Sequence, residues 1–222
     1  ENIPLFKQYL QMNDIYNELT EFHLIVYSIN LSIYICYYLR ITNKQLRDNL
    51  SKELNKLIET INDKNYKYKE FLYIAKLEQK FILKNINLDK GISKNRALLE
   101  NIFSLFVTIN NKVPIFIVGK PGCSKSLSVQ LIIKAMKGNS SNNSFFKTLP
   151  KIIVNSYQGS MGSTSSGVLN IFIKARNILK NIKNKLDKEK NISMIFFDEM
   201  GLAEYSPNNP LKVIHSELEY DL

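Results

Sequence analysis

The sequence predicts an α/β protein, with an N-terminal helical layer followed by a parallel sheet and its flanking helices. Apolar residues recur every three to four positions over about the first half of the chain, as in amphipathic helices. All eight glycines lie at or after Gly91, where tight turns between strands and helices would need them. Short apolar runs then alternate with helical stretches, the pattern of parallel strands joined by helices.

The first part, residues 1–90, is expected to be a helical lead-in region. Leu5, Tyr9, Met12 and Tyr16 follow a helical spacing. Further helices are expected over 24–41, 46–61 and 68–83, with a charged break near 62–67.

The second part, residues 91–222, should contain the sheet. In order, we expect a helix over 95–111, a strand over 113–118, a helix over 127–136 and a polar connection over 138–144. A strand over 152–154, within 151–157, is expected next, and a flexible loop over 159–167 and a helix over 168–185 follow. A strand over 194–197 and a loop forced by prolines 207 and 210 lead to a last helix over 211–218.

The stretch 119–126, Gly-Lys-Pro-Gly-Cys-Ser-Lys-Ser, has the spacing of a P-loop, or Walker A motif, G-x-x-x-x-G-K-[ST]. Ser124 stands where the second glycine is usual, and we expect it to fit if its φ stays negative. Such a loop cradles a triphosphate with backbone N–H groups at a helix N-terminus. The residues expected to bind nucleotide are Gly119, Lys120, Pro121, Gly122, Cys123, Ser124, Lys125, Ser126 and Leu127.

Within this loop, Lys125 should reach the β- and γ-phosphates and the Ser126 hydroxyl should ligate Mg²⁺. Residues 194–199, Met-Ile-Phe-Phe-Asp-Glu, form a buried type of strand ending in two carboxylates, the form of a Walker B element. Asp198 would hold Mg²⁺ through water, and Glu199 would orient or deprotonate the attacking water. ATP and Mg²⁺ are therefore the expected ligands, with Glu199 and Lys125 as the catalytic residues.

The net charge is +10, but Lys, Asn, Asp and Glu are interspersed and no basic cluster has aromatic neighbours. We therefore expect no direct binding of nucleic acid. Cys36 and Cys123 are too few for a disulfide framework or a zinc site, which fits a cytoplasmic protein. Residues 24–39 are short and polar for a membrane span, so we expect a buried helix and no membrane span.

Three stretches together resemble the mysterin-like family of AAA+ E3 ubiquitin ligases. They are residues 91–103, 118–127 and 198–215, of which the last is the most specific. The resemblance implies one AAA+ ATPase module of a large protein, with neighbouring AAA+ modules in the same polypeptide. It also places residues 91–92 near the adenine and residues 159–167 at a pore-loop position. The family's ubiquitin-transfer chemistry uses zinc-bound elements outside this chain, which makes ubiquitin-pathway proteins partners of the parent protein.

An AAA+ sheet has more than the three strands expected here, so we expect an incomplete domain that folds poorly alone and hydrolyses ATP negligibly. Two alternatives to an ATPase module stay open. One is a structural module that holds ATP without turning it over, and the other is an ATPase stimulated by nucleic acid. The Glu199 carboxylate favours turnover over a locked module.

Overall fold

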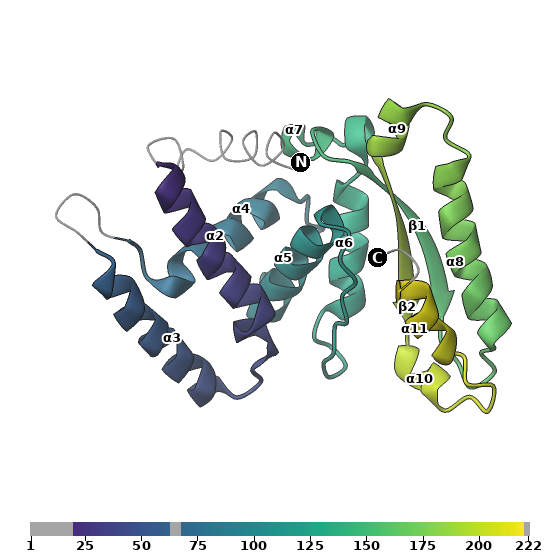
Figure 1. The fold of residues 1–222 in the computed structure, drawn as a ribbon, viewed down its shortest axis with the longest axis horizontal. Helices are drawn as coiled ribbons and strands as arrows, with labels where there is room; N and C mark the ends of the chain where they lie inside the picture. The colour runs from purple at the N-terminus through teal and green to yellow at the C-terminus, as the bar shows by residue number, and fades with distance from the viewer. Residues whose placement is uncertain (1–19, 63–67, 220–222) are drawn as a thin grey trace. The chain divides into compact units, whose positions relative to one another are not determined.

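The computed structural model describes residues 20–62 and 68–219. These residues belong to two compact units, Glu1–Thr108 with Pro114–Leu131, and Ile109–Val113 with Ile132–Leu222. The helical pattern expected over residues 5–16 lies outside the described residues, as does most of the break at 62–67. The chain runs from helices into a parallel sheet flanked by helices, which confirms the predicted α/β class (Figure 1).

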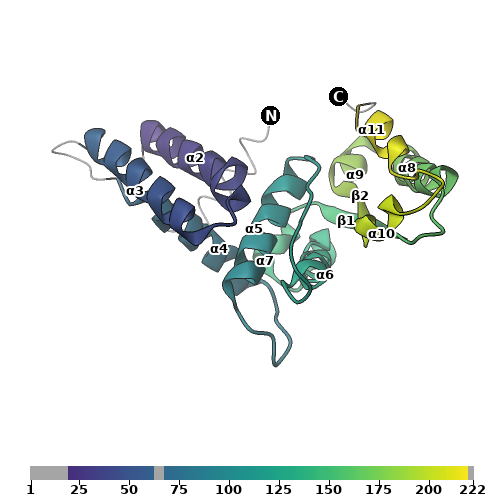
Figure 2. The same cartoon turned by 90° about the horizontal axis from the view of Figure 1, so that it is seen from below.

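The first unit contains the helices predicted from the apolar spacing. They are α2 (Glu21–Cys36), the short 3-10 helix η2 (Tyr38–Arg40), α3 (Lys44–Thr60), α4 (Phe71–Asn85) and α5 (Arg96–Asn110), of which the last two residues of α5 belong to the second unit. Side-chain caps fix where several of them begin: Thr20 accepts from His23 N, Asn43 from Leu46 N, and Asn95 from Leu98 N. Figure 1 and Figure 2 show α4 packing against both α2 and α3.

An aromatic cluster forms the core of this unit. Tyr34 and Tyr38 stack at 5.1 Å between ring centroids, and Phe103 of α5 meets Tyr34 edge-on at 5.9 Å. Phe71 of α4 meets Tyr38 edge-on at 5.8 Å. The cluster therefore joins the lead-in helices to α5, the helix that precedes the glycine-rich loop.

The strand predicted over residues 113–118 does not form. Among the described residues the sheet has two strands, and residues 113–120 have no regular structure. Val113, Phe116 and Val118 are 54%, 63% and 94% exposed. A strand exists through ladder hydrogen bonds to a neighbour, and this stretch has none in the sheet, so its apolar composition alone does not make it β.

The helix after the loop, α6 (Lys125–Ala135), begins two residues earlier than predicted. The polar connection that follows folds into η3 (Gly138–Ser140) and α7 (Ser144–Lys147). Asn143 caps α7 by accepting from Phe145 N and Phe146 N.

The second unit contains the sheet of β1 (Lys151–Gln158) and β2 (Asn191–Asp198). The strands are parallel and in register from Lys151 opposite Asn191 to Gln158 opposite Asp198. Between them, α8 (Ser165–Lys180) and α9 (Lys185–Glu189) replace the single helix predicted over 168–185. Predicted as a buried strand, β2 is half-buried along its whole length.

After β2 come α10 (Met200–Glu204) and α11 (Lys212–Glu219). Figure 1 shows α8 along both strands and α11 against α8, where Arg176 and Glu217 form an ion pair. The predicted strand, helix, strand order is therefore confirmed in this unit. Gly159 directly follows β1, and Glu199 directly follows β2.

In the described part of the chain, one helical run, Glu21–Arg40, is long and apolar enough to span a membrane by length and composition. Core helices of soluble proteins pass the same test. Tyr27, Asn30 and Tyr34 are buried on one face of α2, whereas Phe22 and Ile25 are exposed. The helix predicted to be buried is thus buried on one face only.

Candidate functional site

The loop from Gly119 to Ser124 turns sharply and leads directly into α6. Gly122 has φ +81° and Ser124 has φ +57°. The N–H of Cys123 donates to the carbonyl of Lys120 at 3.3 Å, which closes a turn within the loop. The backbone thus bends back on itself immediately before the N-terminus of an eleven-residue helix, where N–H groups have no partner within the helix.

Ser124 has the left-handed backbone conformation, so the negative φ that we set as the condition for serine to fit does not hold. The turn needs a positive φ where most P-loops have glycine, and serine adopts it at a cost of about 1–2 kcal/mol. The carbonyl of Ser124 accepts from Ser128 N at 2.9 Å, the first bond of α6. This bond helps to hold Ser124 in place.

The Lys125 ammonium lies over the loop. Its Nζ donates to the carbonyl of Gly119 at 2.7 Å and to that of Lys120 at 3.0 Å. A lysine ammonium has three donors and can exchange such carbonyls for phosphate oxygens. The geometry therefore places a positive charge beside the loop's backbone, as a phosphate-binding lysine requires.

The remaining loop residues differ in exposure. The first four, Gly119 to Gly122, are exposed, and residues 123–127 are half-buried. A Cβ placed on Gly119 would lie 3.6 Å from the Cβ of Cys123, an ordinary contact, so Cys123 packs closely against the start of the loop.

Sequence reasoning missed Asn101 of α5. Its Nδ2 donates to the carbonyl of Cys123 at 2.9 Å. No motif identifies this residue, because an asparagine in an amphipathic helix gives no sign of which distant carbonyl it meets.

The two carboxylates lie at the end of β2 in the second unit. Asp198 is the last strand residue, opposite Gln158 of β1, and its Oδ1 accepts from the N–H of Glu199 at 3.0 Å. Glu199 is exposed, has φ +51° and precedes α10. Non-glycine residues in this conformation are uncommon and often lie at functional sites.

Gly159, which follows β1, packs against the backbone of Asp198 and Glu199. Its N–H donates to the carbonyl of Asp198 at 2.8 Å. A Cβ on Gly159 would lie 2.3 Å from the carbonyl oxygen of Glu199. Only glycine fits here, and a glycine directly after a strand was the one sequence signal for it.

The loop over 159–167 is tied down, whereas the sequence suggested a flexible connection. Ser206 Oγ donates to the carbonyl of Ser163 at 2.7 Å, and Ser165 Oγ donates to that of Asn208 at 3.1 Å. Thr164 caps α8, which begins inside the predicted loop at Ser165. The segment after Glu199 therefore holds the loop after β1.

The structure thus brings residues 119–127 together in one unit, and Asp198 and Glu199 together in the other. Within the described ranges, no group of three or more His, Cys, Asp or Glu side chains could hold a metal. The predicted Mg²⁺ ligands, a Ser126 hydroxyl and an Asp198 carboxylate, are the oxygen donors that this ion prefers. With phosphate and water as further ligands, Mg²⁺ needs no such cluster.

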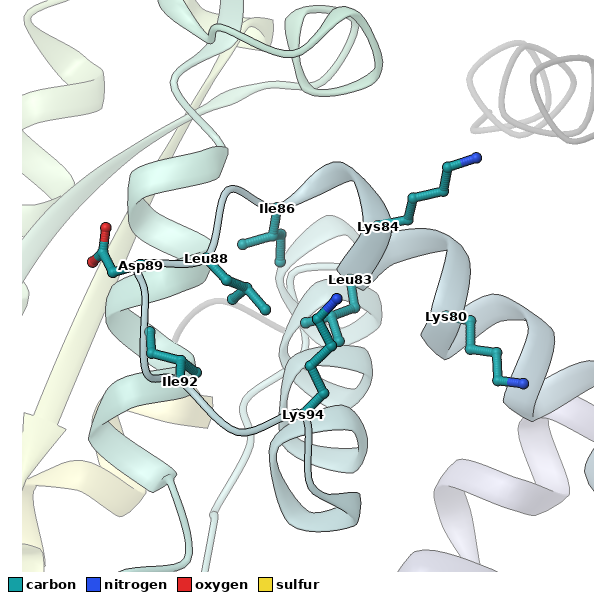
Figure 3. Close-up of a pocket in the computed structure, with 8 residues that line it drawn as sticks. All are labelled: Lys80, Leu83, Lys84, Ile86, Leu88, Asp89, Ile92 and Lys94. Carbon is teal, nitrogen blue, oxygen red and sulfur yellow. The ribbon is translucent and has the colours of Figure 1, made fainter.

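A cavity of about 480 Å³ lies at the N-terminal side of α5, in the first unit. Leu83, Ile86, Leu88 and Ile92 surround its centre, whereas Lys80 and Lys84 point outward (Figure 3). Asp89 and Lys94 complete the lining. Ile92 follows Gly91, whose φ of +93° turns the chain toward α5.

Comparison with known proteins identifies the family. The family model described as RNF213 AAA domain matches residues 91–222, more than half of the chain. E3 ubiquitin-protein ligase rnf213-beta of Danio rerio is 38% identical over 189 residues, 85% of this chain. E3 ubiquitin-protein ligase RNF213 of Homo sapiens is 33% identical over 211 residues, 95% of this chain. The chain spans 4% of the length of each of these relatives. It therefore belongs to the RNF213 AAA domain family, the mysterin-like family that its motifs resemble.

Proposed function

We propose that this chain is an ATP-binding and ATP-hydrolysing module. AAA domains bind nucleotides in general, and the observation that carries the finer proposal is the loop at 119–124. It opens directly into α6, and the Lys125 ammonium lies 2.7 Å from the carbonyl of Gly119. A positive charge, backbone N–H groups and a helix N-terminus at one place make a site for phosphate.

In this proposal the loop residues Gly119 to Leu127 bind the phosphates, with Lys125 contacting the β- and γ-phosphates. Ser126 would ligate Mg²⁺ directly, and Asp198 through water. Mg²⁺ would neutralise charge on the phosphate oxygens. Glu199 would hold the attacking water in line and accept its proton.

The adenine would bind in the cavity lined by Ile92. Its apolar side chains suit an aromatic base, and Asp89 and Lys94 add polar groups to the lining. This supports the placement of residues 91–92 near the adenine that the family resemblance implies.

The parent protein, we infer, is a large E3 ubiquitin ligase of the cytoplasm. The relatives are named as E3 ubiquitin-protein ligases. Neighbouring AAA+ modules of the same polypeptide and ubiquitin-pathway proteins would be its partners. The ligase chemistry would lie outside residues 1–222, and the loop at 159–167 would be a pore loop.

The first test is a titration of the chain with a fluorescent ATP analogue and Mg²⁺, with circular dichroism to follow folding. Lys125→Ala should abolish saturable binding, because it removes the charge beside the loop. Lys52→Ala, at an exposed position on α3, is the matched control and should bind normally. A folded chain that does not bind, or a Lys125→Ala variant that binds as well as the control, would contradict the proposal.

Turnover is tested separately in the full-length protein. Glu199→Gln should keep nucleotide binding and lose phosphate release, because an amide cannot accept the proton from water. Unchanged release in this variant would contradict the role of Glu199. Binding without any release in the unchanged protein would instead favour the locked structural module.

A further inference from the structure

The side-chain amide of Asn101 is placed to control one peptide group of the loop. Its Nδ2 lies 2.9 Å from the carbonyl oxygen of Cys123. A carbonyl oxygen only accepts hydrogen bonds, so the NH₂ end of the amide must face it. This contact joins α5 to the loop across 22 residues of sequence.

The carbonyl of Cys123 belongs to the same peptide group as the N–H of Ser124. The structure contains no cis peptide bond among its described residues, and in a trans peptide the C=O and N–H point in opposite directions. Holding the carbonyl against α5 therefore turns the N–H of Ser124 away from α5. The backbone N–H groups of such a loop are its phosphate donors.

Ser124 itself makes this restraint necessary. A serine with φ +57° has a more stable alternative with negative φ. Rotation toward that alternative would reorient the Cys123–Ser124 peptide and its N–H. The bond from Asn101 opposes this rotation at the residue where glycine is missing.

Asn101 is in turn held by a rigid helix. Its neighbour Glu100 pairs with Arg47 at 3.0 Å and with Arg96 at 2.7 Å. Ile102 and Phe103 on the following positions are 1% and 2% exposed. Because core packing and this ion-pair network hold α5 in position, the helix also holds the Asn101 side chain in position beside the loop.

We propose that Asn101 is a positioning residue that fixes the Cys123–Ser124 peptide so that the Ser124 N–H is directed at bound phosphate. This proposal rests on the function proposed above. It adds a residue outside the P-loop motif to the nucleotide site, and it explains how serine at position 124 is compatible with binding.

The test measures the dissociation constant for the fluorescent ATP analogue with Mg²⁺ in four chains: unchanged, Asn101→Asp, Ser124→Gly and the double variant. Asp has nearly the shape of Asn but, when ionised, has no donor for the Cys123 carbonyl. Asn101→Asp should weaken binding about 10-fold, the effect of losing one good hydrogen bond. Asn49→Asp, the same change at an exposed position on α3, should bind normally.

The double variant distinguishes positioning from general damage. Glycine at position 124 adopts positive φ without strain, so Asn101→Asp should cost about 2-fold or less in that background. Lower pH should also restore binding by Asn101→Asp relative to the unchanged chain, because a protonated carboxyl donates to the carbonyl again. Equal losses in both backgrounds, or a loss that does not respond to pH, would overturn the proposal.

Folding and the proposed function are checked in the same experiment. If circular dichroism shows that Asn101→Asp is unfolded, Asn101→Ala replaces it in the cycle, since it removes the donor without adding charge. An unchanged chain that is folded by circular dichroism and binds no ATP refutes the proposed function. An unchanged chain that binds, beside an Asn101→Asp variant that binds equally well, refutes the positioning role alone.

Discussion

Gly159→Ala most directly tests the packing of Gly159, which follows β1, against the backbone of Glu199, which follows β2. A Cβ at this position would lie 2.3 Å from the carbonyl oxygen of Glu199 and 2.9 Å from its carbonyl carbon. Real Cβ contacts are essentially never shorter than 3.0 Å, so the Glu199 oxygen must move by at least 0.7 Å, and by about 1 Å for an ordinary contact. The obstacle is backbone, which cannot rotate away like a side chain.

Two hydrogen bonds resist this movement. The Gly159 N–H donates to the Asp198 carbonyl at 2.8 Å, and the Glu199 carbonyl accepts from Leu202 N at 3.0 Å. Displacing Glu199 therefore disturbs the first turn of α10 and the carboxylate that would activate water. A misplacement of about 1 Å at a catalytic group can lower turnover by about 100-fold. Such overpacking should also lower the free energy of unfolding by about 1–3 kcal/mol.

The assay is phosphate release from ATP by the full-length protein, with nucleotide affinity measured beside it. Gly159→Ala should lower turnover about 100-fold and affect affinity less, because the residues proposed to bind the phosphates, 119–127, are unchanged. Gly201→Ala is the matched control, since its Cβ would meet nothing within 4 Å. Turnover by Gly159→Ala equal to that of the control would refute the reasoning.

Three further predictions concern stability, each measured by urea unfolding. Ser124→Gly should raise the free energy of unfolding by about 0.5 kcal/mol, because relief of the left-handed strain exceeds the entropy cost of glycine. Ser128→Gly, inside α6, should lower the free energy of unfolding. A decrease for both variants would contradict the strain at Ser124. Arg47→Ala should lower the free energy of unfolding by about 3 kcal/mol, because the paired side chains of Arg47 and Glu100 are only 12% and 17% exposed. Lys56→Ala, which breaks the exposed ion pair with Glu53, should have little effect. Equal effects of the two substitutions would mean that the Arg47 pair adds nothing to stability. Burial raises the pKa of Glu78 from 4.5 to about 8, so between these pH values the folded chain keeps a proton that the unfolded chain has lost. The free energy of unfolding should therefore fall by a few kcal/mol as pH rises from 4.5 to 8. Glu78→Gln should remove this fall, and a variant with the same pH dependence would assign the fall to another group.

Some features of this protein follow from the sequence because they depend on neighbours in the chain. Helices α3 to α5 form where apolar residues recur at helical spacing, and Asn43 and Asn95 cap two of them. The helix that follows the glycine-containing loop and the strand that ends at Asp198 were likewise predictable, since short patterns of neighbouring residues indicate them. These choices are local, so a single sequence contains the information for them.

Other features depend on which distant segments meet. The apolar stretch at 113–118 looks like a strand, but it pairs with no strand among the described residues, and strand formation needs a partner. Three contacts join residues that are 22 to 43 positions apart in the sequence. They are the hydrogen bond from Asn101 to Cys123, the close packing of Gly159 against Glu199, and the hydrogen bond from Ser206 to Ser163. Only the tertiary structure decides such contacts, because sequence periodicity specifies which face of an element is apolar but not which atom it meets across the fold.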